Sequence, residues 1–152
     1  MEEQMTKENA LAHLDAARRS HIKWLNRAKS MVDGKNMVRD PHPLESTACQ
    51  FGLWFNSEGE KLYKLLGIEG DDTVRLIHNK LHEKYLAIYE IYFGSAEGIV
   101  YDQKAKLLKK NVSKAEDERA RSLMQDLKKL SYRMLEEIIH LENTVKKSNS
   151  FD

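Results

Sequence analysis

The first thirty residues repeat a largely apolar position at alternating intervals of four and three residues. The positions in this series are Ala10, Leu14, Ala17, His21, Trp24, Ala28 and Met31. Such spacing aligns side chains along one face of an α-helix. It predicts a helix over residues 4–33, with Gly34 as its C-cap.

Two later stretches show the same helical spacing. The first begins at Asp71 or Asp72, runs to about Phe93, and has an inward face of Val74, His78, Leu81, Tyr85, Ile88 and Tyr92. The second covers about 114–147 and has an inward face of Ala120, Met124, Leu127, Ser131, Met134, Ile138, Leu141 and Val145. Ser113 followed by Glu116 is the pattern of a capping box, so the last helix is predicted to begin there.

The region between the first and third helices is less regular. Both prolines of the chain lie in 34–44, which predicts a loop. A second helix is predicted to start at Ser46 or Thr47. Residues 56–59, Asn-Ser-Glu-Gly, suggest a break, and a shorter helix is then expected over 60–66, ending at Gly67.

Residues 95–112 mix apolar and basic side chains and predict a short amphipathic helix over 101–110. The expected fold is therefore all-α: an antiparallel four-helix bundle with a linker or short extra helix before the last helix. A chain of 152 residues is the size of one domain, which we assign to 1–152.

Charge and composition exclude several classes of function. The chain has 25 Lys and Arg against 24 Asp and Glu, so a broad nucleic-acid surface is not expected. The lysines in 104–110 are read as a solvated face. No apolar run is long enough for membrane insertion, and the acidic N-terminus lacks the features of a signal peptide. A single cysteine excludes an internal disulfide, and we expect a cytoplasmic location.

Four residues stand out as possible metal ligands. His78 and His82 are four residues apart, which puts both imidazoles on one face of the third helix. His21 lies on the apolar face of the first helix, and Cys49 is in the predicted second helix. Each could be an ordinary core residue. Together they offer three nitrogens and one sulfur, a complete tetrahedral donor set for zinc.

The spacing of these residues resembles a known family. His21-x-x-Trp24 is followed after 24 residues by Cys49-x-Phe-Gly52-x-Trp54, and after 23 more by His78-x-x-x-His82. This is similar to the chemoreceptor zinc-binding domain, whose pattern is H-x-x-W, then C-x-[aliphatic or Phe]-G-x-W, then H-x-x-x-H. The resemblance covers residues 10–93.

The resemblance implies that His21, Cys49, His78 and His82 bind one zinc ion. It implies a bacterial, cytoplasmic helical bundle that often dimerises. Relatives usually carry a methyl-accepting chemoreceptor segment or a diguanylate cyclase, and 152 residues leave no room for either. The chain is expected to be a free-standing module that signals through a partner of that kind, in chemotaxis or cyclic-di-GMP control, or else a fragment of a longer protein.

The other motif residues have expected supporting roles. Gly52 would let a neighbouring helix approach the cysteine face closely. Trp24 and Trp54 would pack beside the metal and limit the access of water. Both tryptophans would also serve as ordinary core residues.

A closed four-ligand site leaves no position for a substrate, so we do not expect an enzyme. Asn79 follows His78, where a zinc protease has glutamate. Reversible zinc binding fits sensing better. Acid weakens binding because the ligands must be deprotonated, and oxidation of Cys49 would remove its thiolate. A purely structural zinc is the static alternative.

Two other functions remain open. A haemerythrin-like di-iron protein also has H-x-x-x-H on its third helix, but here His140 is followed five residues later by Val145 rather than an acid. His42 likewise has Ser46 where a glutamate is needed. The other alternative is a metal-free helical adaptor, whose fold would survive chelation.

The chain is expected to form a homodimer, because leucines outside the inward faces leave apolar surface to cover. Examples are Leu11, Leu25, Leu123 and Leu130. The remaining histidines, His13, His42 and His140, are not assigned to the metal.

Overall fold

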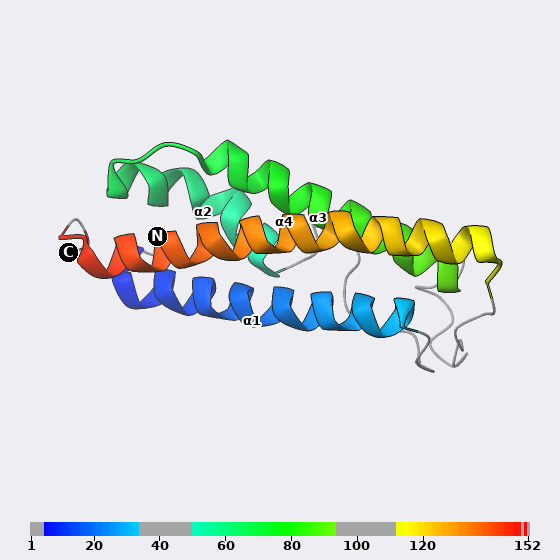
Figure 1. Cartoon of the computed structure of the whole chain (residues 1–152). Coiled ribbons are helices and arrows are strands. Elements are labelled where there is room, and N and C mark those ends of the chain that lie inside the picture. The colour runs from blue at the N-terminus through cyan, green and yellow to red at the C-terminus, as the bar shows by residue number, and fades with distance from the viewer. Residues whose placement is uncertain (1–4, 34–49, 94–111, 150, 152) are drawn as a thin grey trace.

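The computed structural model describes residues 5–33, 50–93, 112–149 and 151 (Figure 1). It contains α1 (Lys7–Val32), α2 (Gln50–Leu66), α3 (Asp71–Phe93) and α4 (Lys114–Lys147). These described residues contain no strand, and the prediction of an all-α fold with four main helices is confirmed. The predicted proline loop, the start of the second helix at Ser46 or Thr47, the Gly34 cap and the helix over 101–110 lie outside the described residues.

The predicted inward faces of α1, α3 and α4 are confirmed. Every residue assigned to them is buried, including the polar Ser131 on α4. The three faces meet in one core, where burial of apolar surface is the main favourable term in folding. Helical periodicity was informative here because each helix is longer than 20 residues.

Two side-chain caps define helix starts. The Thr6 hydroxyl accepts from Asn9 N–H at 3.0 Å, so α1 begins at Lys7 rather than at the predicted residue 4. At α4 the predicted capping box is present: Ser113 Oγ accepts from Glu116 N–H at 3.1 Å, and Glu116 Oε1 accepts from Ser113 N–H at 3.0 Å.

Helices α1 and α4 lie side by side and run in opposite directions (Figure 1). At one end, Lys7 Nζ donates to the carbonyl oxygen of Lys146 at 3.1 Å. At the other, Arg121 Nη2 donates to the carbonyl oxygen of Val32 at 3.5 Å. Helix α3 packs along α4, where Lys84 pairs with Asp126 at 3.5 Å, and the shorter α2 contacts α1 and α3.

The predicted break in the second helix is wrong, because α2 continues from Gln50 to Leu66. Ser57 stays helical by donating its hydroxyl to the carbonyl oxygens of Leu53 and Trp54, at 3.2 and 3.1 Å. A Cβ on the buried Gly59 would lie 3.0 Å from the Phe55 ring. Gly59 therefore gives the Phe55 ring room in a continuous helix, and it does not mark a turn.

Helix α2 ends at Gly67, as predicted. Gly67 has a φ of 68°, its N–H donates to Lys64, and the N–H of Ile68 donates to Tyr63, both at 3.1 Å. This is the hydrogen-bond pattern of a Schellman motif. It closes the helix and lets the chain turn into α3.

Replacing Gly67 with alanine is expected to lower the free energy of unfolding by about 1 kcal/mol, since a Cβ disfavours positive φ. No atom within 4 Å would obstruct that Cβ, so the loss would come from the backbone alone. Urea titration of both proteins measures it. Gly67→Asn should lose less, because asparagine tolerates this conformation. Equal losses for the two variants would argue against a backbone origin.

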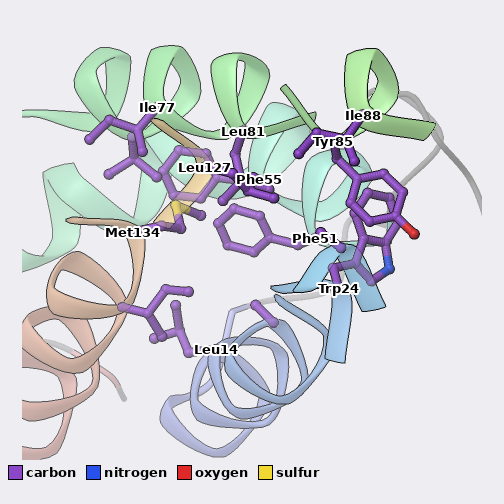
Figure 2. Packing of buried hydrophobic residues seen from close by; sticks show 14 of the residues in the cluster. Leu14, Trp24, Phe51, Phe55, Ile77, Leu81, Tyr85, Ile88, Leu127 and Met134 are labelled. Carbon is purple, nitrogen blue, oxygen red and sulfur yellow. The ribbon is translucent and has the colours of Figure 1, made fainter. Parts of the chain in front are cut away.

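The centre of the core is rich in aromatic rings (Figure 2). Trp24 from α1 and Phe51 and Phe55 from α2 meet residues from α3 and α4 that include Ile77, Leu81, Tyr85, Leu127 and Met134.

Within the described residues, none of the helices has a long enough apolar stretch to span a bilayer. The assignment of 1–152 to one domain stays a prediction.

Candidate metal centre

His21 points into the bundle from the middle of α1. Its Nδ1 lies 2.7 Å from the carbonyl oxygen of Ala17, one turn earlier on the same helix. A carbonyl oxygen only accepts, so Nδ1 carries the proton and Nε2 keeps its lone pair. That Nε2 is buried and has no hydrogen-bond partner. An unsatisfied buried nitrogen is costly, and a metal ion would use its lone pair.

His78 and His82 come from α3. They lie one turn apart, and their Nε2 atoms are 3.0 Å from each other. Their rings are T-shaped with centroids 4.5 Å apart. The His21 ring is also T-shaped to both, at 5.1 Å from His78 and 6.0 Å from His82. The two histidines predicted from the i, i+4 spacing therefore meet the histidine of α1.

The three histidines can converge on one ion. One ring nitrogen from each lies within 4.8 Å of the others, and the side chains are buried. Ligand nitrogens of a tetrahedral zinc lie about 3.3 Å apart, given Zn–N bonds of about 2.0–2.1 Å. Small side-chain rotations would reach that spacing. The set has no carboxylate, which favours zinc or another transition metal over magnesium or calcium.

Burial keeps His21 and His78 in the neutral, ligating form. Loss of hydration lowers the pKa of His78 to about 2, and repulsion from His21 and His82 adds to this effect. Burial also lowers the pKa of His21, against the opposing effect of its bond to Ala17. Neutral imidazoles at pH 7 are ready to bind a metal without first releasing protons.

Aromatic side chains enclose the cluster. The centroid of the Trp24 ring lies 4.4 Å from that of the His82 ring and 4.7 Å from that of the Tyr85 ring. The centroid of the Phe51 ring of α2 lies 5.0 Å from that of His78 and 5.8 Å from that of His21. An apolar shell limits the access of water and strengthens polar bonds inside it.

The other candidate residues, Cys49, Gly52 and Trp54, are not part of the histidine cluster that the structure describes. Cys49 lies outside the described residues and directly precedes Gln50, the first residue of α2. Gly52 is buried on α2. Trp54 is buried too, and it stacks on His13 with centroids 4.7 Å apart and an interplanar angle of 9°.

The stacking of His13 on Trp54 was not foreseen. His13 directly precedes Leu14 of the inward face of α1, but nothing in the sequence indicates which ring from α2 would cover it. His13 is not one of the three clustered histidines among the described residues. His140 is exposed on α4, and His42 lies outside the described residues.

Comparison with known families agrees with the resemblance read from the motifs. Residues 21–89 match the family model of the chemoreceptor zinc-binding domain. The matched segment starts at His21 and includes Cys49, His78 and His82. No curated protein and no solved structure matches the chain.

Proposed function

Because residues 21–89 match the chemoreceptor zinc-binding domain, we propose that this chain is a zinc-binding sensory module. In this proposal His21, Cys49, His78 and His82 hold one zinc ion. The carrying observation is the buried cluster of three histidines, one of which has an Nε2 without a partner. Each histidine would give one lone pair to the ion.

The start of α2 supports Cys49 as the fourth ligand. Phe51, two residues later, has its ring against both His21 and His78. The first turn of α2, which directly follows Cys49 in the sequence, is therefore next to the histidines. A thiolate would complete the tetrahedral set and favour zinc over harder ions.

The expected role is regulation rather than catalysis. Four protein ligands fill a tetrahedral zinc and leave no position for a substrate. Zinc would join α1, the start of α2 and α3, so its loss would release three elements from one another. Acid or oxidation of Cys49 would promote that loss.

The output is proposed to pass through a cytoplasmic partner of the chemoreceptor or cyclase type. The chain would then report zinc or an oxidant to bacterial chemotaxis or cyclic-di-GMP signalling. This step is supported by the family match alone, since the described residues contain no second signalling element.

Elemental mass spectrometry of the purified chain tests the zinc proposal. We expect about one zinc per wild-type chain, and loss or ready chelation of it in Cys49→Ala and His82→Ala. His140→Ala is the matched control, since His140 is exposed on α4 and should not affect zinc.

Other metal contents would select the alternatives. A wild-type chain without zinc that cannot be reloaded would contradict the proposal and favour a metal-free helical adaptor. Two irons per chain would instead favour a haemerythrin-like site. Zinc retained equally by His82→Ala would exclude this ligand set.

A further inference from the structure

Ser131 is the exception on the inward face of α4. The other positions of that face carry apolar side chains, whereas Ser131 carries a hydroxyl and is only 2% exposed. Apart from tyrosine and tryptophan, the polar side chains buried in the described part of the chain are those of Ser131, His21, His78 and His82. Burying a hydroxyl costs free energy unless it gains a hydrogen bond, and alanine is the better helix former. A serine at this position therefore indicates a use for its hydroxyl.

The contacts between α1 and α4 place Ser131 level with the histidine of α1. The side chain of Arg121 on α4 reaches the carbonyl oxygen of Val32 on α1, and the two helices run in opposite directions. Ten residues along α4 from Arg121 is Ser131, and ten residues back along α1 from Val32 is Ile22. Both helices rise by the same amount per residue, so Ser131 is level with Ile22 and its neighbour His21.

The contact between α3 and α4 places Ser131 level with His78 as well. Lys84 of α3 pairs with Asp126 of α4 at 3.5 Å, and these two helices also run in opposite directions (Figure 1). Five residues along α4 from Asp126 is Ser131, and five residues back along α3 from Lys84 is Asn79, the neighbour of His78. The buried hydroxyl therefore faces the core at the level of the histidine cluster.

Zinc would change the hydrogen bonds that His78 needs. The Nε2 atoms of His78 and His82 are 3.0 Å apart, so in the metal-free chain one ring carries its proton on Nε2 and donates to the other. If zinc takes the Nε2 lone pair of both rings, each ring carries its proton on Nδ1 and needs an acceptor there. His21 has such an acceptor in the carbonyl oxygen of Ala17. Within the described residues, Nδ1 of His78 has none.

We propose that Ser131 is a positioning residue of the metal centre, and that its hydroxyl oxygen accepts a hydrogen bond from His78 Nδ1–H when zinc is bound. This inference rests on the proposed function. An acceptor on the outer nitrogen fixes the tautomer and the orientation of a ligating ring. Helix α4 supplies none of the three clustered histidines, so this bond would connect it to the occupancy of the site. Zinc would then act on all four helices.

Competition for zinc with a chromophoric chelator tests this role. Ser131→Ala removes the hydroxyl, and zinc should bind about tenfold more weakly or worse, since the loss of a supporting contact costs roughly 10–100-fold in metal affinity. Ser131→Thr keeps a hydroxyl and should recover most of the affinity. The matched control is Ser57→Ala, which removes a hydroxyl that bonds to carbonyl oxygens of its own helix, α2. It should leave zinc affinity unchanged.

Two further measurements separate positioning from packing. Urea titration of metal-free Ser131→Ala should show no loss of stability, because the hydroxyl makes no hydrogen bond to another described residue and alanine favours the helix. In NMR spectra of the zinc-loaded chain, the Nδ1–H proton of His78 should move upfield in Ser131→Ala as its hydrogen bond is lost. The Nδ1–H proton of His21 should not move, since its acceptor is the carbonyl oxygen of Ala17.

The results distinguish this inference from the proposed function. Equal zinc affinity in wild type and Ser131→Ala would overturn the role of Ser131 and leave the zinc site in place. So would an unmoved His78 proton, a Ser131→Thr variant that binds zinc no better than Ser131→Ala, or a matching loss of stability in the metal-free chain. A wild-type chain that binds no zinc would overturn both.

Discussion

Saturating zinc is expected to raise the free energy of unfolding by about 4 kcal/mol when free zinc is a thousandfold above its dissociation constant. The ligands are brought together only in the folded chain, since His21 is on α1 and His78 and His82 are on α3. Urea titrations of the chelated and the zinc-loaded chain measure the gain. The gain should grow with the logarithm of free zinc.

His78→Ala should abolish most of this zinc-dependent gain. Removing a residue that only supports a ligand lowers metal affinity roughly 10–100-fold, and removing the ligand itself should lower it more. His140→Ala should keep all of it, since that side chain is exposed. A gain of the same size in both variants would mean that zinc stabilises the fold from some other place. No gain in wild type would separate the cluster from metal binding.

The metal-free chain is expected to lose stability steeply as the pH falls below the ordinary histidine pKa of 6.5. The folded-state pKa of His21 is lowered and that of His78 is lowered to about 2, so the unfolded chain binds more protons in this range. Stability therefore rises with pH through this window and falls as the pH decreases. Two such groups give a slope of up to about 2.7 kcal/mol per pH unit once both titrate in the unfolded chain.

Urea titrations of the chelated chain at pH 7.5, 6.5, 5.5 and 4.5 would measure this slope, a range chosen to bracket the reference pKa of about 6.5. His78→Leu removes one of the two groups, so its slope should be about half that of wild type. An unchanged slope in this variant would show that His78 is not buried in its neutral form. A flat profile in wild type would contradict the burial of both imidazoles.

The sequence predicted the parts of the fold that depend on repeated spacing. All the residues assigned to the inward faces of α1, α3 and α4 are buried, and the Ser113 cap is present. A long amphipathic helix repeats the apolar position of its inward face over many turns, so one polar residue in the series does not change the prediction. The convergence of His21 with His78 followed from the same faces, because both lie on them, and the position of His82 followed from its i, i+4 spacing to His78.

The sequence was misread, or gave no prediction, where a residue's role depends on its three-dimensional surroundings. Gly59 was taken as a helix breaker, but it accommodates the Phe55 ring inside α2. The stacking of His13 on Trp54 depends on how α2 is rotated against α1, which spacing within one helix does not determine. The bond from His21 Nδ1 to Ala17, which leaves the lone pair on Nε2, depends on the rotamer of the ring, and the sequence does not determine that rotamer.

The contact between Lys7 and the carbonyl of Lys146 also bears on protein engineering. The beginning of α1 and the end of α4 lie at the same end of the bundle (Figure 1). A domain whose first and last helices end close together can be inserted into a surface loop of another protein without distorting the fold of that protein. Joined to a fluorescent protein in this way, the bundle would transmit a change in the spacing of its two ends directly to the chromophore. The same neighbourhood permits a circular permutant, in which a short linker joins α4 to α1 and new termini open between α2 and α3.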